Sequence, residues 1–357
     1  MVVLGALLAL AAGTAGDVPS LVERIDAARP FADGTRAKSV PSTTTPPPTT
    51  TTSTPAPLAW TLYAGGDVLM DRSEPAGRDP FVKLVPALAE ADVALVNVEM
   101  VIAEGGAAED GKEFVFRAPP SAATTLASSG VDVANLGNNH SRDFGPDALE
   151  EMIGLLRGAG VQTVGAGTDA AGALAPAVFR LGTDAAPVSV AILGASANVP
   201  AGWMAGAQPG IATTRGDALI EAVVAARREH DVVIVTVHWG DENAPCPNDA
   251  QVTIGDALIA AGASAVIGHH PHVLQPIVER GGGLIAYSLG NFAWHSRSGP
   301  QGDTGLLELR FLGADLDGFT FHPHVLDANG DPEPAGLDAT GRIEAAISPN
   351  CDLVLAT

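Results

Sequence analysis

From residue 58 onward, short apolar runs alternate with longer amphipathic stretches, and this alternation restricts the fold more than any other feature of the sequence. Runs rich in Val, Ile and Ala predict buried strands at Trp60–Ala64, Val93–Val98, Val131–Asn135, Val188–Leu193, Val232–Val237, Ala265–Ile267 and Leu284–Tyr287. The stretches between several of these runs predict helices at Pro80–Ala89, Pro119–Ser129, Pro146–Ala159, Asp217–Glu229 and Asp249–Ala261. Strands and helices that alternate in this way are typical of a layered α/β fold.

The end of the chain has a different pattern. Residues 305–326 predict two strands joined by a turn near Ala314–Gly318, and residues 327–357 predict a loop with one short helix. The sequence is therefore interpreted as one folded domain over residues 58–326 with a C-terminal extension over residues 327–357. With 357 residues, of which 46% are hydrophobic, the chain is long enough to bury a substantial core.

Two segments precede this domain. Residues 1–16 are apolar and end in small residues, as in a signal peptide, and the run is shorter than the roughly 20 apolar residues that a spanning helix needs. No Lys or Arg precedes the apolar run, so an uncleaved N-terminal anchor stays the alternative. Residues 17–57 form a linker, rich in Thr and Pro over residues 41–57, which predicts an extended spacer. The two segments predict a secreted or envelope-associated protein, in contact with a membrane only if the N-terminal segment is retained.

The charge of the chain restricts its partners. A formal net charge of −22 disfavours binding to nucleic acid, because the phosphate backbone would be repelled. It does not exclude an anionic substrate, since a bound divalent cation reverses the field around it. The two cysteines, Cys246 and Cys351, are too few for a zinc cluster or a disulfide framework, and whether they pair is left open. The oligomeric state is not indicated.

Polar side chains follow the predicted strands at the points where the strands end. These candidate metal ligands are Asp67, Glu99, Asn139, His238, His270 and His272. In open α/β sheets, binding sites form where strands end and loops begin, so we expect these side chains to converge. The run His269-His270-Pro271-His272 is the strongest single signal, because it places three imidazoles within four residues after an apolar strand.

The ligand types indicate the class of metal. Imidazole combined with carboxylate suits Zn, Mn or Fe, and carboxylate oxygens favour Mn and Mg. The sequence therefore predicts one or two divalent ions, which can lower the pKa of bound water and generate a nucleophile. Arg117 and Arg142 are candidates to hold an anionic substrate through bidentate contacts, with surface ion pairs as the alternative. Asn291, which follows the strand at Leu284–Tyr287, is a third substrate-binding candidate.

At this point the residues match a known pattern. The ordered motifs are Gly65-Gly66-Asp67, Asn97-Val98-Glu99, Asn138-Asn139-His140, His238-Trp239-Gly240, His270-Pro271-His272 and Ser288-Leu289-Gly290-Asn291-Phe292. This series resembles the bacterial capsule-synthesis CapA family, which is associated with poly-γ-glutamate and looks like a branch of the calcineurin-like metallophosphoesterases. The resemblance runs from about Trp60 to Trp294. It implies a four-layer α/β/β/α sandwich with a metal site at one sheet edge.

The resemblance also implies roles for individual residues. Asp67 matches the first aspartate ligand, and Glu99 stands where an aspartate bridges two metals. Asn139 matches a further ligand. His238 and His270 would hold one metal and His272 the other. His140 matches the general acid that protonates the leaving oxygen.

Two positions depart from the superfamily's pattern. The first motif normally has a histidine two residues after the aspartate, and here that position is Leu69, so one metal would lose a ligand. The acidic partner expected directly after His140 is Ser141, although Asp143 is close enough to replace it. Both departures bear on whether two-metal phosphatase chemistry is retained.

Two alternative functions are consistent with these predicted residues and with the family resemblance. The first is a metal-dependent hydrolase that acts on an anionic polymer or phosphoester in the metabolism of capsule, poly-γ-glutamate or another envelope polymer, with His140 and Asp143 as catalytic residues. The second is a non-catalytic envelope component that assists the assembly, anchoring or export of an anionic capsular polymer.

Overall fold

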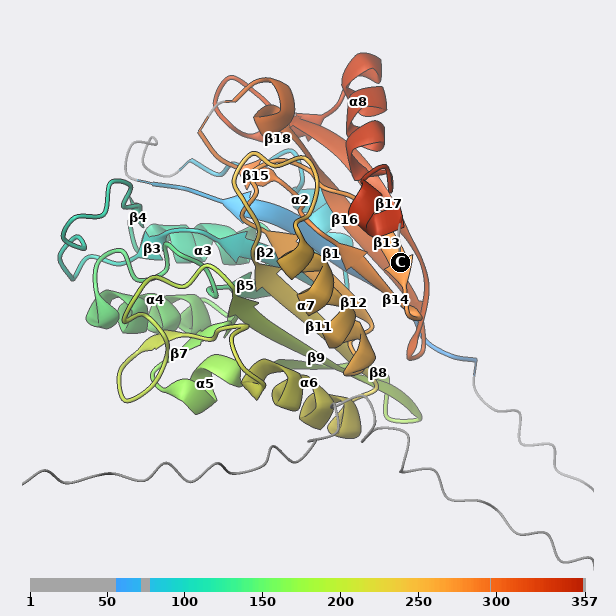
Figure 1. Ribbon diagram of the computed structural model, residues 1–357, viewed down its shortest axis with the longest axis horizontal. Helices are drawn as coiled ribbons and strands as arrows, with labels where there is room; N and C mark the ends of the chain where they lie inside the picture. Colours follow the sequence, from blue (N-terminus) through green and yellow to red (C-terminus); the bar gives the residue numbers. More distant parts are fainter. Residues whose placement is uncertain (1–55, 72–77, 296, 356–357) are drawn as a thin grey trace, which may run out of the picture. The chain divides into compact units, whose positions relative to one another are not determined.

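The computed structural model describes residues 56–71, 78–295 and 297–355 (Figure 1). The predicted signal peptide or anchor over residues 1–16, and the linker up to residue 55, lie outside the described residues. In the part of the chain that is described, no helix combines the length and the apolar character needed to cross a membrane.

The described strands form two large mixed sheets. The first sheet has the order β18 (Pro332–Pro334), β17 (Asp315–Leu326), β16 (Asp303–Leu312), β1 (Ala59–Val68), β2 (Val93–Val98), β5 (Val133–Asn135), β6 (Gln162–Val164), and β15 (Asn291–Ala293) also pairs with β1. The second sheet has the order β13 (Ile277–Arg280), β14 (Gly283–Ala286), β12 (Ala265–His269), β11 (Val232–His238), β9 (Ala186–Ser196), β8 (Ala177–Thr183). In each sheet the central strands are parallel, so their carboxyl ends lie at the same edge.

Apolar side chains fill the space between the two sheets. This cluster includes Trp60 and Leu62 from β1 and Ile192, Ile234 and Ile267 from the second sheet, all of them buried. The ring of Trp60 stacks on the ring of Phe311 with centroids 4.2 Å apart, which joins β1 to β16. Because both faces of the parallel strands are buried, these strands are apolar throughout rather than alternating with polar residues.

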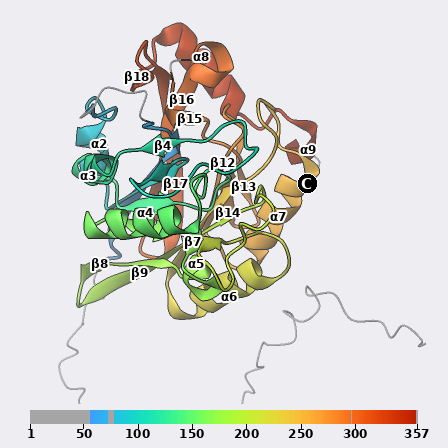
Figure 2. The ribbon, with the colours of Figure 1, turned by 90° about the vertical axis from the view of Figure 1, so that its left-hand side faces the viewer.

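Helices cover the outer face of each sheet (Figure 2). The first sheet is covered by α2 (Val85–Glu90), α3 (Ser121–Ser128) and α4 (Pro146–Gly158), whose apolar side chains share a core with β2. The second sheet is covered by α6 (Ala218–Glu229) and α7 (Asp249–Ala260), which pack on β11 and β12. The order helix, sheet, sheet, helix is the four-layer α/β/β/α sandwich that the resemblance implied, and that prediction is confirmed.

Each strand and helix predicted from the alternating region forms, with small differences at the ends. The helix expected from Pro80 begins only at Val85, because Asp79 Oδ1 accepts a 2.9 Å bond from the Phe81 N–H and holds residues 80–84 in turns. The predicted hairpin also forms, but its turn lies at Gly313 and Ala314, since Asp315 already pairs with Leu312. The remaining short elements are β3 (Val101–Ile102), β4 (Arg117–Ala118), β7 (Ala166–Gly167), β10 (Gly210–Ile211), α5 (Ala170–Leu174) and a 3₁₀ turn (Gly299–Gly302).

The last stretch of the chain holds more structure than the single short helix that we expected. It contains β18, which pairs with β17, followed by α8 (Leu337–Ile347) and α9 (Asp352–Leu355). Arg342 of α8 forms a bidentate ion pair with Asp303 of β16 at 2.5 and 2.6 Å, which fixes the helix on the first sheet. Cys351 is disulfide-bonded to Cys246 with a Cα–Cα distance of 5.8 Å, so the two cysteines do pair.

Candidate metal centre

The structure brings the six predicted metal ligands together at the carboxyl edge of the two sheets. Asp67 ends β1 and Glu99 follows β2, both in the first sheet. Asn139 lies in the loop after β5, His238 ends β11, and His270 and His272 follow β12. The backbone N–H of His270 donates to Asp67 Oδ2 at 3.3 Å, so this edge of one sheet is in direct contact with the same edge of the other.

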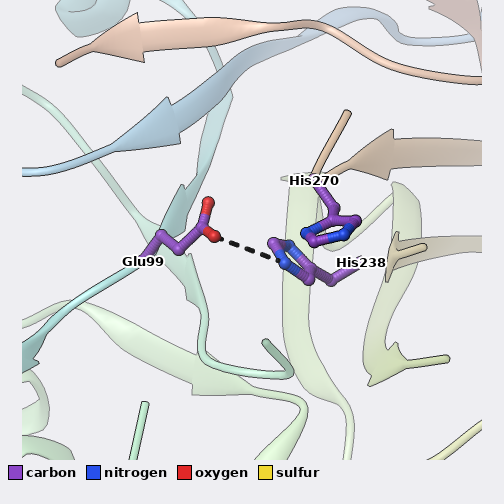
Figure 3. A group of neighbouring side chains, drawn as sticks. All are labelled: Glu99, His238 and His270. Carbon is purple, nitrogen blue, oxygen red and sulfur yellow. Dashed lines mark ion pairs between the residues drawn. The ribbon is translucent and has the colours of Figure 1, made fainter. Parts of the chain in front are cut away.

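Glu99 is fully buried. Its carboxylate points towards the ring of His238, beside which His270 lies (Figure 3). Its Oε1 atom is 3.4 Å from His238 Nε2 and 3.8 Å from His272 Nε2, and it has no hydrogen-bond partner among the described residues. Glu99 with His238 and His270 forms one group whose ligand atoms lie within 4.8 Å of one another, and Glu99 with Asp67 and His272 forms another. A carboxylate shared by two such groups has the placement of a bridging ligand.

The group formed by Glu99, His238 and His270 has an additional oxygen nearby. Asn139 Oδ1 is 2.6 Å from His238 Nε2, the same nitrogen that faces Glu99. An amide oxygen, a carboxylate oxygen and two imidazoles therefore surround one small volume. This donor set suits Zn, Mn or Fe, which accept mixed nitrogen and oxygen ligands.

A network of buried amides orients the carboxylates. Asn97 donates through Nδ2 to Asp67 Oδ1 at 2.8 Å, and its own Oδ1 accepts bonds from Asn135 at 2.9 Å and Asn138 at 3.2 Å. The same Asn97 Nδ2 lies 3.3 Å from His238 Nδ1. We did not predict a role for Asn97 itself, although it shares the signal of the ligands, a polar residue at the end of an apolar strand. Partners of this kind outside the ligand shell fix ligand orientation.

Backbone geometry at the site explains its glycines and reveals strain. A Cβ on Gly66, directly before Asp67, would lie 2.0 Å from the carbonyl oxygen of Gly290, so only glycine allows β1 to approach that loop. His270 and His272 have φ angles of 99° and 57°, in the left-handed region that most side chains avoid. Such residues cost about 1–3 kcal/mol each and cluster at functional sites, because the surrounding fold enforces them.

Burial controls the protonation of the cluster. Burial lowers the pKa of His238 well below its usual value and that of His270 to about 4, and neighbouring imidazoles add to both effects. Burial also raises the pKa of Glu99, with a further contribution from the charge of Asp67. Burial lowers the pKa of His272 too, but Glu99, Asp67 and Asn291 outweigh it and raise the value to about 10. The low pKa values favour neutral imidazoles at His238 and His270, and neutral imidazoles beside buried carboxylates are the ligands that a divalent cation requires.

His140 lies beside this cluster and forms a pair with Asp143. His140 Nδ1 is 2.8 Å from Asp143 Oδ2, and the same oxygen accepts the Phe116 N–H at 2.8 Å. Asp143 is fully buried and forms an ion pair with Lys112. Ser141 does not contact His140 through its hydroxyl group, which donates to Leu136 O at 2.6 Å. Asp143, and not Ser141, is therefore the acidic residue that contacts the His140 ring.

Lys112 was not predicted and is the cationic side chain next to this pair. Besides Asp143 it donates to the backbone carbonyl of Asn139, and its ammonium lies 4.8 Å from the ring centroid of Trp203. It therefore joins the loop after β3, the loop after β5 and the loop after β9 beside the candidate acid. Nothing in the sequence around Lys112 distinguishes it from a surface lysine.

The structure places the three predicted substrate-binding residues differently from one another. Arg117 donates to the carbonyls of Glu104 at 3.1 Å and Gly106 at 3.0 Å, and its guanidinium lies 3.6 Å from the centroid of the Phe144 ring. Arg142 donates to the carbonyl of Gly202 at 2.8 Å. Asn291 Oδ1 is 2.9 Å from His272 Nδ1, which places it in the cluster itself. A substrate-binding role stays a prediction for all three.

Comparison with known families fits this picture. A model of the family described as "Bacterial capsule synthesis protein PGA_cap" matches residues 61–296. The chain belongs to this family. The resemblance inferred from the motifs is thereby confirmed.

Relatives of this PGA_cap protein include the PGA biosynthesis protein CapA of Bacillus subtilis, 30% identical over 237 residues that cover 64% of this chain and 62% of the relative. The probable polyglutamine synthesis accessory protein of Mycobacterium tuberculosis H37Rv is 32% identical over 208 residues, 56% of this chain and 55% of the relative. The chain thus spans less than two thirds of each. Among solved structures, the NAD nucleotidase of Haemophilus influenzae is 12% identical with a TM-score of 0.47, covering 82% of this chain and 57% of that chain.

At position 69, where the resemblance implies a histidine ligand, this PGA_cap protein has a leucine, which cannot bind a metal. Leu69 is only 3% exposed and packs in the apolar core beneath the site, with Phe81 and Phe292 in the same cluster. Its backbone N–H donates to Ala293 O at 2.7 Å, so this segment is held in place by β15. The group around Asp67 and His272 therefore lacks a donor from position 69.

Proposed function

We propose that this capsule-synthesis family protein is a metal-dependent hydrolase of the metallophosphoesterase type that acts outside the cytoplasm on an envelope polymer or its phosphoester precursors. The observation that carries this proposal is the buried Glu99 Oε1, which belongs to two groups of ligands and accepts no hydrogen bond from any described residue. A buried carboxylate oxygen without a hydrogen bond is costly, and a divalent cation bound there would remove that cost. Asp67, Glu99, Asn139, His238, His270 and His272 would hold the metal, which when bound acts as a Lewis acid and activates water.

The neighbouring residues provide the acid that such a hydrolysis needs. Asp143 engages Nδ1 of His140, so Nε2 is the nitrogen left to give a proton to a departing oxygen. Lys112 compensates the charge of Asp143, which is otherwise buried. His140 is 7% exposed, so bulk water has little access to the ring.

Three further features support the substrate class and the location. The relatives' names refer to capsule, PGA or polyglutamine synthesis, which favours an anionic polymer as the partner of this chain. A chain with a net charge of −22 needs a cation to bring such a polymer to its site. The Cys246–Cys351 disulfide is typical of a protein in an oxidising compartment, in agreement with the apolar N-terminal segment.

Metal analysis is the direct test. We expect the purified chain to retain about one or two divalent ions per molecule by elemental mass spectrometry and to hydrolyse p-nitrophenyl phosphate or bis-p-nitrophenyl phosphate. His270→Ala removes an imidazole from the group with Glu99 and should reduce both the metal content and turnover, the latter by about 100-fold or more. His230→Ala, a change of the same type far from the site, should alter neither. A wild-type chain without metal would overturn the proposed site.

The role of His140 has a separate test. His140→Gln is expected to lower the hydrolysis of esters with poor alkyl leaving groups by about 10²–10⁴-fold, the range that general acid catalysis supplies. Esters of p-nitrophenol should lose much less, because that leaving group departs without protonation. Steady-state kinetics over a series of leaving groups measures the difference. An equal loss for every ester would show that His140 is not the acid.

The non-catalytic alternative is favoured by one observation, the buried Leu69 where the superfamily has a metal-binding histidine. Under this alternative the chain keeps the metal for structure and assists polymer assembly, anchoring or export. Bound metal without turnover on any phosphomonoester, phosphodiester or polyglutamate substrate would establish it over the hydrolase.

A further inference from the structure

One carboxylate beside the site belongs to none of the strand-end motifs. Glu242 lies in the loop between β11 and α7, four residues after His238. Its carboxylate forms a third group with His270 and His272, in which the ligand atoms lie within 4.8 Å of one another. The side chain is exposed, whereas both partners face the buried cluster, so Glu242 lies at the mouth of the site.

The loop that carries Glu242 is fixed directly against these histidines. The N–H of Asn243 donates to the carbonyl of Pro271 at 2.8 Å, which joins the residue after Glu242 to the residue between His270 and His272. Gln275 donates to the carbonyl of Ala244 at 2.9 Å. The Cys246–Cys351 disulfide adds a covalent tether four residues after Glu242. Glu242 is therefore positioned by its backbone and does not need to reach the histidines from a mobile loop.

A second observation points to a ligand at this place. His270 is 8% exposed, and its Nδ1 atom has no hydrogen-bond partner among the described residues. An imidazole nitrogen so deeply buried is normally satisfied, and the exceptions mark a bound group or a function. The same histidine adopts a φ of 99°, so the fold maintains this orientation against strain.

We propose that Glu242 is a metal ligand at the mouth of the site, in a group with His270 and His272, and that it adds a carboxylate to a site that receives no ligand from Leu69. This inference rests on the proposed metal centre but not on hydrolysis. Leu69 packs in the core and offers no donor, whereas Glu242 is exposed and offers a carboxylate oxygen close to His270 and His272. With Asp67 and Glu99 it raises the number of carboxylates at the site to three, which shifts the preferred metal towards Mn or Mg.

The test compares two substitutions on the same loop, each of which replaces a carboxylate with a neutral amide. The metal-free full-length chain is titrated with Mn²⁺, and free Mn²⁺ is followed by electron paramagnetic resonance. Glu242→Gln is expected to weaken one Mn²⁺-binding step by about tenfold or more, as expected for loss of a ligand or of its close support. Asp241→Asn is the matched control, because Asp241 carries the same charge one residue earlier and accepts a 2.8 Å bond from Asn248 rather than belonging to a ligand group.

The outcomes separate this inference from the proposed function. A loss confined to Glu242→Gln supports ligation. Equal losses in both variants would reduce the role of Glu242 to long-range charge, and no loss in either would exclude it, so each overturns the inference. Mn²⁺ binding by the wild type without hydrolysis of any ester overturns the hydrolase function and leaves the assignment of Glu242 standing. A wild type that binds no Mn²⁺ overturns the assignment of Glu242, whereas the proposed function falls only if elemental analysis finds no divalent metal of any kind.

Discussion

Replacing Glu99 with glutamine is expected to abolish metal binding and, at the same time, to stabilise the metal-free protein. Glu99 belongs to two of the three ligand groups, and glutamine replaces its carboxylate with a neutral amide, so each of these groups loses a charged ligand. Without a bound cation its carboxylate is buried beside Asp67, and burial, followed by the charge of Asp67, raises its pKa. A neutral side chain of the same shape relieves this cost, which for a buried unsatisfied group is about 1–3 kcal/mol. Thermal unfolding with EDTA and with added metal measures both effects.

The two halves of this result distinguish a metal ligand from a structural carboxylate. In EDTA the variant should unfold at a higher temperature than the wild type, and with metal the order should reverse, since only the wild type gains stability from binding. Glu279→Gln, on the exposed face of β13, changes the same charge and should move neither transition. If Glu99→Gln were less stable in EDTA, Glu99 would instead be held by protein partners.

The convergence of the ligands could be predicted from the sequence because it follows from topology. Asp67 and His238 are 171 positions apart, yet both end a parallel strand, and parallel strands that follow right-handed crossovers bring their carboxyl ends to one edge. The apolar pattern marks the end of β11 to within one residue, whereas β1 continues to Val68, four residues past its predicted end at Ala64. The alternation of strands and helices does not predict that two sheets pack face to face. That arrangement was implied by the family resemblance, which rests on the order of the motifs.

Residues whose place depends on loop paths could not be predicted in this way. Lys112 reaches Asp143 from an irregular loop that Trp203 supports, and Glu242 reaches the histidines only because Asn243 bonds to Pro271. These contacts have no periodicity and join segments distant in the sequence. The C-terminal stretch was under-predicted for a related reason: β18 is three residues long with proline at both ends, and it becomes a strand only by pairing with β17.

Loss of the disulfide is the second change with a large expected effect. The Cys246→Ser/Cys351→Ser double variant should unfold at lower urea, with a loss of about 2–5 kcal/mol, because the bond closes a loop of 105 positions and restricts the unfolded chain. Equilibrium unfolding in urea measures it. The wild type with its disulfide reduced should show the same loss, which controls for the effect of the serines.

The same double variant tests whether the disulfide helps to hold the mouth of the site in place. Cys246 tethers the loop that carries Glu242, so its loss should also weaken Mn²⁺ binding. The loop keeps its bonds from Asn243 to Pro271 and from Gln275 to Ala244, and for that reason we expect a smaller change than in Glu242→Gln. A stability loss with unchanged Mn²⁺ affinity would show that these two bonds suffice to place Glu242. A loss of affinity equal to that of Glu242→Gln would show instead that the disulfide alone holds the ligand in position.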